Sequence, residues 1–492
     1  MAVGKKSNAA DSGSHLKGIS QLDAITYMRD SKLNHHFIMN ATTSPIAKLP
    51  VREKLAYGLG DFASNLIFAT LSAFLMFYYT DIFGLSAAAV GTLLFVARAT
   101  DAVWDLYLGT LVDRTRTRWG QCRPYLVFGA PVLALCTIAT FTVPSGSDAY
   151  KLGYAYITYT LLMISYSLVN IPYSAMPALM TSDPRDRTTL AAFRMFMAIF
   201  ATMLVGALTL KLVAVFGGGN KQAGYQTTMT LTALTGMVLY WVCATFTRER
   251  VPPVHQPKEV RKDLSTLVAG RAWWMMALMG LCVYTALSIT TGSVLYYFKY
   301  VVGIEARAST YFALAGLALM IGILLSVQLT KRFCKRKVMM VAASSAGVFY
   351  AVFYFVDPQS MAQVFVVGFL IQLFNGITTP ILWSMVADTA DDAELRSGRR
   401  MVGLTTSSIA FSQKFGLGVG GAIAGLLLAA IGYQANVAQT PAVVHGLTII
   451  MSWIPAFSKV LVVVILYFYP LGQRQLDETQ VALQRARLAT ST

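Results

Sequence analysis

The feature that most constrains this chain is a series of uninterrupted apolar stretches of about twenty residues each, spread between Tyr57 and Tyr469. A stretch of that length crosses about 30 Å of hydrocarbon as an α-helix. The strands of a membrane β-barrel would instead alternate apolar and polar residues over about ten positions. Charged residues make up only 13% of the chain, roughly half the share typical of soluble proteins. The sequence therefore predicts an all-α polytopic membrane protein and excludes a water-soluble globular fold.

Basic residues gather in alternate connections between these stretches, and they account for the formal net charge of +17. The three basic connections contain Arg114, Arg116, Arg118 and Arg123, then Arg248, Arg250, Lys258, Arg261 and Lys262, and finally Lys331, Arg332, Lys335, Arg336 and Lys337. By the positive-inside rule, these loops and both termini face the cytoplasm, as expected for a protein of a bacterial inner membrane. The excess charge thus indicates membrane topology, and we expect no nucleic-acid partner.

The longest internal polar stretch lies near the middle of the chain and contains three prolines. We interpret residues 248–272 as a cytoplasmic linker between two halves of six transmembrane helices each, residues 51–247 and 273–470. Residues 1–50 and 471–492 are predicted to be polar cytoplasmic tails. Because a basic connection follows the second span of each half, we expect two parallel repeats with a substrate site between them near the midplane.

An acidic pair lies inside the second predicted span. Asp101 and Asp105 are four residues apart on one helical face, and Arg98 lies one turn before them. A charge at mid-membrane costs about 2.5 to 3.5 kcal/mol, so such a pair indicates function. Two like carboxylates beside an arginine can take up and release a cation or a proton, which predicts a coupling-ion site. The alternative is that Asp105 lies near the cytoplasmic end and only supports the following loop.

Further polar and aromatic residues inside the spans are candidates for substrate binding, because such residues usually face the interior of a helical bundle. These candidates are Asn65, Arg98, Asn170, Tyr173, Arg194 and Trp383. The amides and guanidinium groups could bind sugar hydroxyls or an anionic substituent, and the rings could stack on a sugar. The alternative for the aromatic residues is packing or anchoring at the membrane interface. Lys414 is predicted to take part in cation coupling, or else only to neutralise Asp101.

The first basic connection also carries the features of a gate. Asp113 can pair with Arg114 or Arg118, and glycines on both sides let helices approach closely. We expect these residues and Asp388 to hold an inner gate. A topogenic signal alone would explain the arginines, but it would not explain the glycines.

Taken together, these segments resemble the glycoside-pentoside-hexuronide:cation symporters of the major facilitator superfamily. The resemblance extends from Glu53 to about Pro470. It rests on the segments Tyr57-Gly58-Leu59-Gly60-Asp61, Tyr78-Tyr79-Thr80-Asp81, Arg98 to Asp105, Arg118-Trp119-Gly120 with Arg123-Pro124, Asn170-Ile171-Pro172-Tyr173 and Ala387-Asp388-Thr389. It implies a major facilitator fold of twelve transmembrane helices. It also implies that Asp101 and Asp105 form the cation site, that Lys414 lies beside it, and that Arg194 lines the sugar pocket.

Several departures from the family pattern bear on specificity. Galactoside-transporting relatives carry acidic sugar ligands where this chain has Asn65 and Asn170, and a tryptophan where it has Ser174. Galactoside specificity therefore does not carry over. A less acidic pocket suits an anionic sugar such as a hexuronide or a sulfonated sugar, whereas the amides would serve a neutral pentoside equally well. Trp104 stands where sodium-using relatives offer an amide oxygen, which favours H+ over Na+ as the coupling ion.

The predicted function is a secondary active sugar:cation symporter that works by alternating access between two open states. Its partners are a small-molecule sugar, the coupling cation and the lipid bilayer, and we expect a monomer with no cofactor. The alternative is an uncoupled sugar facilitator or a membrane sensor on the same fold. We do not expect an enzyme or a metal centre, because the five histidines lie in tails and loops without the spacing of metal ligands.

Overall fold

The fold is known from a computed structural model that describes residues 49–251, 268, 270–397, 402–471, 475, 478, 479 and 482. All described helices lie in one compact unit, residues 50–492. In the first half of this unit the helices are α2 (Val51–Phe77), α3 (Ala87–Arg114), α4 (Arg123–Thr140), α5 (Asp148–Met180), α6 (Pro184–Gly217) and α7 (Lys221–Phe246). In the second half they are α9 (Arg271–Tyr296), α10 (Arg307–Arg332), α11 (Lys335–Phe353), α12 (Met361–Ser397), α13 (Val402–Ala430), α14 (Pro441–Met451) and α15 (Trp453–Phe468).

Twelve helical segments of the described chain are long and apolar enough to cross a membrane. This result and the absence of β-strands among the described residues confirm the predicted fold class. Large apolar side chains around the outside of the bundle are exposed, for example Leu135, Leu324 and Phe355. Such side chains are stable on the outside of a bundle when hydrocarbon surrounds it. The predicted boundaries of the tails and of linker 248–272 stay predictions, since most of these residues lie outside the described part.

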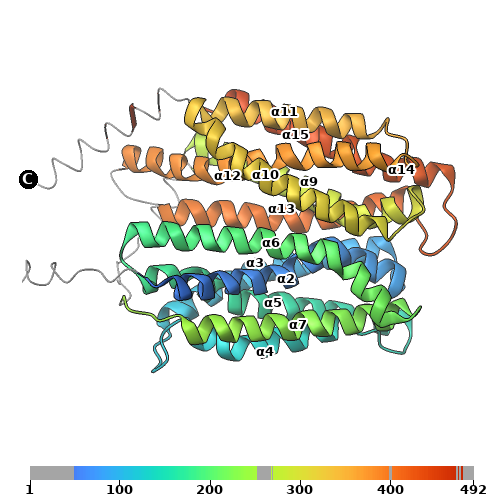
Figure 1. The fold of residues 1–492 in the computed structure, drawn as a ribbon, viewed down its shortest axis with the longest axis horizontal. Helices are drawn as coiled ribbons and strands as arrows, with labels where there is room; N and C mark the ends of the chain where they lie inside the picture. Colours follow the sequence, from blue (N-terminus) through green and yellow to red (C-terminus); the bar gives the residue numbers. More distant parts are fainter. Residues whose placement is uncertain are drawn as a thin grey trace, which may run out of the picture. The chain divides into compact units, whose positions relative to one another are not determined.

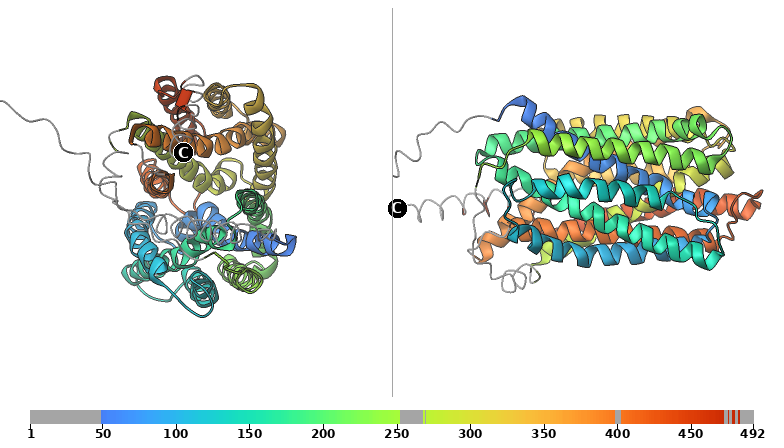
Figure 2. Two further views of the ribbon diagram at one scale, coloured as in Figure 1. Left: turned by 90° about the vertical axis from the view of Figure 1, so that its left-hand side faces the viewer. Right: turned by 90° about the horizontal axis from the view of Figure 1, so that it is seen from below.

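The helices form two groups when the bundle is viewed end-on, with α2 to α7 on one side and α9 to α15 on the other (Figure 2). The two groups meet along three helix pairs, α2 with α9, α3 with α13, and α6 with α10. Helices α3 and α13 approach closely where Gly91 faces Gly425, since a Cβ at Gly425 would lie 2.6 Å from the Cα of Gly91. The site described below lies where these pairs meet.

Several helices begin at a polar cap, which satisfies backbone N–H groups that have no partner inside the helix. The caps include Ser86, Ser147, Asp183, Asn220 and Thr440, each of which accepts a hydrogen bond from a backbone N–H in the first turn.

The cap at Thr440 corrects one predicted boundary. The apolar run from Ile449 to Tyr469 predicts the last span, but the helix begins at Pro441 and is broken only at Ser452.

The first helix of each half ends in a π-helical turn, Tyr78–Ile82 after α2 and Tyr297–Val301 after α9. A glycine with positive φ follows each turn, Gly84 at 89° and Gly303 at 82°. Helices α2 and α9 both run from the end of the bundle where α2 begins to the opposite end, where α14 begins (Figure 1). We call the first the tail end and the second the far end, and both π-turns lie at the far end.

Candidate functional site

The predicted coupling residues lie together between the two halves. Lys414 on α13 binds both carboxylates on α3, with its Nζ 3.2 Å from Asp101 Oδ2 and in an ion pair with Asp105 Oδ2. Ser167 on α5 donates a hydrogen bond of 2.6 Å to Asp101 Oδ1. Asp101 is fully buried, whereas the side chains of Asp105 and Lys414 keep about a fifth to a quarter of their surface exposed. One basic side chain thus joins two acidic ones across the interface.

This cluster retains a free acceptor. Asp105 Oδ1 is buried and has no hydrogen-bond partner among the described residues. The Trp104 indole N–H next to it in the chain is also buried without a partner, and its ring packs against Tyr107 at 5.1 Å. A buried carboxylate oxygen without a donor is costly, so this position is able to accept a proton or another cation.

A second charged cluster lies within the first half. Arg194 on α6 donates a 3.0 Å hydrogen bond from Nε to Asp61 Oδ1 on α2, and its Nη2 donates to Ser174 Oγ on α5 at 3.3 Å. Asn65 on α2 donates to both the backbone carbonyl and the carboxylate of Asp61, at 2.9 and 3.4 Å. Two predicted substrate residues, Arg194 and Asn65, therefore converge on one carboxylate, Asp61, which was not predicted.

A cavity of about 280 Å³ lies between the halves, and Asn65 of the Asp61 cluster is part of its lining. Its polar lining includes the predicted residues Asn65 and Arg98, together with Tyr159, Ser288 and Gln413. Arg98 is largely buried and lies over the ring of Phe68 at 5.3 Å. The cavity thus has hydroxyl, amide and guanidinium groups between the two halves, where a substrate site was expected.

The remaining predicted substrate residues occupy varied positions. Tyr173 is fully buried, stacks on Tyr57 with ring centroids 4.8 Å apart, and donates a hydrogen bond to the Tyr57 carbonyl. It supports Arg194, which lies over its ring at 5.4 Å. Asn170 accepts a weak 3.5 Å hydrogen bond from Ser64. Trp383 is partly buried and packs against the hydrophobic cluster that contains Tyr284.

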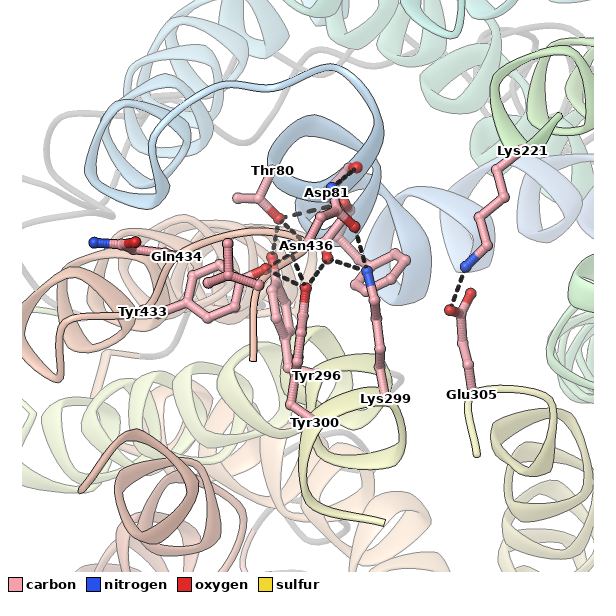
Figure 3. Close-up of polar contacts among 12 residues, drawn as sticks. Thr80, Asp81, Lys221, Tyr296, Lys299, Tyr300, Glu305, Tyr433, Gln434 and Asn436 are labelled. Carbon is pink, nitrogen blue, oxygen red and sulfur yellow. Dashed lines mark hydrogen bonds and ion pairs between the residues drawn. The ribbon is translucent and has the colours of Figure 1, made fainter. Parts of the chain in front are cut away.

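The far end of the bundle is held closed by a second cluster that joins the halves (Figure 3). Its centre is Asp81, at the first π-turn, whose side chain is 1% exposed. Asp81 accepts hydrogen bonds from Lys299 Nζ at 2.6 Å, from the Tyr433 hydroxyl at 2.6 Å and from the Tyr300 hydroxyl. Asn436 donates to the Asp81 backbone carbonyl at 2.7 Å. We call these five residues the far-end latch.

Additional contacts extend the closure around the latch. Thr80 donates to Asp81 at 2.7 Å, and its hydroxyl lies 2.7 Å from that of Tyr296 on α9. An ion pair of 2.5 Å joins Lys221 of the first half to Glu305 of the second (Figure 3). The two π-turns face each other in this arrangement, because Asp81 comes from one and Lys299 and Tyr300 from the other.

The predicted gate residues lie at the tail end, and the contacts found for them stay within one half. Asp388 binds Lys335 of the neighbouring helix α11 at 2.9 Å. Arg114 is exposed at the end of α3, and Arg118 lies over the ring of Trp119 at 5.5 Å. The side chain of Asp113 lies outside the described part of the chain. Their assignment to an inner gate stays a prediction.

Sequence reasoning did not assign roles to Ser167, Asp61 or the far-end latch. A signal for the latch is present, since a Tyr-Tyr-Thr-Asp segment after the first span of one half is matched by Tyr-Phe-Lys-Tyr after the first span of the other. Within the described residues, no group of three or more His, Cys, Asp or Glu side chains gathers as a metal site would require.

Comparisons with known proteins agree with this geometry. The family model described as MFS/sugar transport protein matches residues 56–473. The chain is 34% identical to the inner membrane symporter YicJ of Escherichia coli (strain K12), over 85% of this chain and 91% of that protein. It is also 34% identical to the isoprimeverose transporter of Lactiplantibacillus pentosus, over 86% of this chain and 89% of that protein.

Among solved structures, that of a D-xylose-proton symporter superposes with a TM-score of 0.61 at 14% sequence identity, covering 85% of this chain and 97% of the other. At that identity the likeness concerns the fold alone. It is the fold of two helical groups that meet around a central cavity.

Proposed function

Because this chain belongs to the MFS/sugar transport protein family, and its relatives include an inner membrane symporter and an isoprimeverose transporter, we propose that it is a proton-coupled importer of a glycoside. The sugar binds in the cavity between the halves at the level of Asn65 and Arg98. The coupling proton binds at the pair Asp101 and Asp105. The basic connections lie in the cytoplasm, so the far end faces the opposite side of the membrane.

The observation that carries this proposal is the position of Lys414. Its ammonium group, from the second half, lies between two carboxylates of the first half. When a proton binds one carboxylate, Lys414 loses part of its attraction to α3 and the contact between halves weakens. Protonation at this point is therefore linked to the relative movement of the halves, which is what coupled transport requires.

Proton coupling is favoured over sodium coupling by the donor set of the cluster. A sodium ion needs several oxygen ligands, whereas a proton needs a single acceptor. Lys414 already occupies the position between the carboxylates, and Trp104 adds only an N–H donor. Asp105 Oδ1, without a donor of its own, is the acceptor we assign to the proton.

A neutral sugar fits the charges around the cavity better than an anionic one. An anionic sugar would need basic side chains that are free to bind it, but Arg194 and Lys414 are each already paired with a carboxylate. Three acidic side chains, Asp61, Asp101 and Asp105, balance three basic ones, Arg98, Arg194 and Lys414. A neutral glycoside enters such a site without leaving a charge uncompensated.

The test is uptake into proteoliposomes that contain the purified protein, with a panel of neutral glycosides and glucuronides. An imposed pH gradient should drive accumulation of a neutral glycoside, and an imposed sodium gradient without a pH gradient should not. Asp101→Asn should abolish accumulation, whereas Asp392→Asn, which removes only an exposed pair with Arg396 on α12, should leave it unchanged. Equal uptake with and without gradients in the wild type would instead identify an uncoupled facilitator.

A further inference from the structure

A second cavity, of about 410 Å³, lies at the far end of the bundle, where α6 of the first half meets α10 of the second. Farther from this end the two helices touch, since a Cβ at Gly206 would lie 2.5 Å from Phe312 and a Cβ at Gly316 would lie 2.8 Å from Met203. The lining of the second cavity comes from the last two turns of α6, the turn between α6 and α7, and the start of α10. None of these residues lines the cavity assigned to the sugar.

The charges of the second cavity favour an anion. Two lysines line it, Lys211 on α6 and Lys221 at the start of α7, against one acidic residue, Glu305. Glu305 pairs with Lys221 (Figure 3), whereas Lys211 has no ion-pair partner among the described residues. One positive charge is therefore left over, and a ligand with one negative charge would balance the charges of the lining.

Hydrogen-bond donors accompany the two lysines. Asn220 caps α7 with its side-chain oxygen, which leaves its NH2 group to donate to a ligand. Ser309, on the α10 side of the lining, has a buried hydroxyl with no hydrogen-bond partner in the described part of the chain. Two ammonium groups, an amide and a hydroxyl offer more donors than the carboxylate of Glu305 can accept. Phosphate oxygens are strong acceptors for such donors.

The surroundings of Lys211 indicate a lipid phosphate. Lys211 lies six residues before the end of α6, about 9 Å along the helix axis, a depth from which a lysine side chain extends to the level of the lipid headgroups. Leu208 and Val215 lie three residues before it and four after it, on the same face of the helix. Their side chains are 38% and 73% exposed, so acyl chains can pack on them while the phosphate group contacts the lysine.

We propose that the second cavity binds the phosphate group of an anionic phospholipid with one negative charge, such as phosphatidylglycerol, in the leaflet at the far end. The phosphate oxygens accept hydrogen bonds from Lys211, Lys221 and Ser309, and the acyl chains lie along the exposed apolar face of α6. Glu305 keeps its pair with Lys221, because an ammonium group has three donors. The lining includes residues of both halves, so the bound lipid connects them beside the far-end latch.

The experiment measures ligand binding to the purified full-length protein by native mass spectrometry, with dioleoylphosphatidylglycerol, dioleoylphosphatidylcholine and glycerol 3-phosphate as probes. The wild type should bind phosphatidylglycerol about tenfold more tightly than the zwitterionic phosphatidylcholine. Glycerol 3-phosphate, which has no acyl chains, should bind more weakly than phosphatidylglycerol by more than about tenfold. Lys211→Gln should weaken the binding of phosphatidylglycerol by about tenfold.

Two further variants test the site without relying on a loss of binding. Lys151→Gln is the matched control, because Lys151 lies near the far end at the start of α5 but does not line the second cavity; it should leave the affinity unchanged. Glu305→Gln removes the acidic side chain of the lining, so it should strengthen the binding of phosphatidylglycerol by about tenfold. A gain of affinity cannot result from a protein that fails to fold.

Four outcomes overturn the proposal. Equal affinity of the wild type for phosphatidylglycerol and phosphatidylcholine excludes an anion-selective site. An equal loss in Lys211→Gln and Lys151→Gln would mean that the basic surface as a whole attracts the lipid. Glycerol 3-phosphate that binds as tightly as phosphatidylglycerol would identify a soluble phosphate as the ligand. Weaker binding in Glu305→Gln would show that the carboxylate does not compete with the phosphate group.

Discussion

Two clusters join the halves of this protein, and each is built around a lysine of the second half and an acidic residue of the first. In the central cluster, one lysine faces two carboxylates, and one carboxylate oxygen has no donor among the described residues. In the far-end latch, one lysine faces one carboxylate, and the hydroxyl groups of Tyr300 and Tyr433 donate to the same carboxylate, as does Thr80 beside the latch. The central cluster has more acceptor oxygens than donors, which allows a cation or a proton to bind. In the far-end latch each acceptor has a donor, so the latch holds the two halves together.

The largest expected effect is that of replacing the central lysine. Lys414→Gln would leave two carboxylates without a compensating charge, and breaking a buried pair costs about 3 to 5 kcal/mol. We expect sugar accumulation to fall by more than about a hundredfold, measured as uptake under a pH gradient. Accumulation close to the wild-type level would mean that the central cluster is structural. The central cluster and the far-end latch would then not differ in role.

The next effect is that of Asp81→Asn at the far end. The change leaves Lys299 without its ion pair, so we expect the closed arrangement to lose about 3 kcal/mol, a roughly hundredfold change in the open-to-closed ratio. A cysteine introduced in the cavity, Thr291→Cys, should then react much faster with a membrane-impermeant thiol reagent added outside. Uptake by this variant should still depend on the pH gradient, which would separate the role of the latch from that of the central cluster.

A smaller effect is expected when a single hydroxyl donor is removed from the latch. Tyr433→Phe deletes one hydrogen bond to a carboxylate, which is worth about 1.5 kcal/mol or roughly a tenfold change in the same ratio. The same labelling of Thr291→Cys measures it. A change as large as that of Asp81→Asn would show that the hydroxyls carry the closure and that the ion pair contributes little.

The smallest effect concerns pH. Burial and the neighbouring Asp81 raise the pKa of the Tyr433 hydroxyl above its ordinary value of 10.0. A raised pKa means that this donor keeps its proton below pH 10, and its contribution is lost only as the pH rises above that value. The ratio of Thr291→Cys labelling with the intact latch to that with Asp81→Asn cancels the pH dependence of the thiolate, and this ratio should thus stay constant between about pH 6 and pH 9, while uptake varies. A ratio that follows the pH profile of uptake would contradict the separation of the two clusters.

The spans were predictable from sequence because each apolar run is long enough to cross the bilayer, and both acidic residues of the central cluster stood out as charges inside such a run. The start of the last span was not predictable in this way. His445 and Gly446 interrupt the apolar run, although the helix already begins after the cap at Thr440. The latch could not be derived either. Its ion pair joins residues 218 positions apart, and neither Asp81 nor Lys299 reveals its partner by local spacing.

Pairing of the latch depends on the two π-turns at Tyr78–Ile82 and Tyr297–Val301. A π-turn holds one more residue than an α-turn, and one residue corresponds to about 100° of helix rotation. Deleting one residue from either turn would restore a regular helix and rotate the following side chains away from the facing half. Every latch residue would still be present in the chain, but it would point in another direction. These turns therefore set the direction in which the latch side chains point. An insertion or deletion in a π-turn should disturb closure of the far end more than many substitutions do.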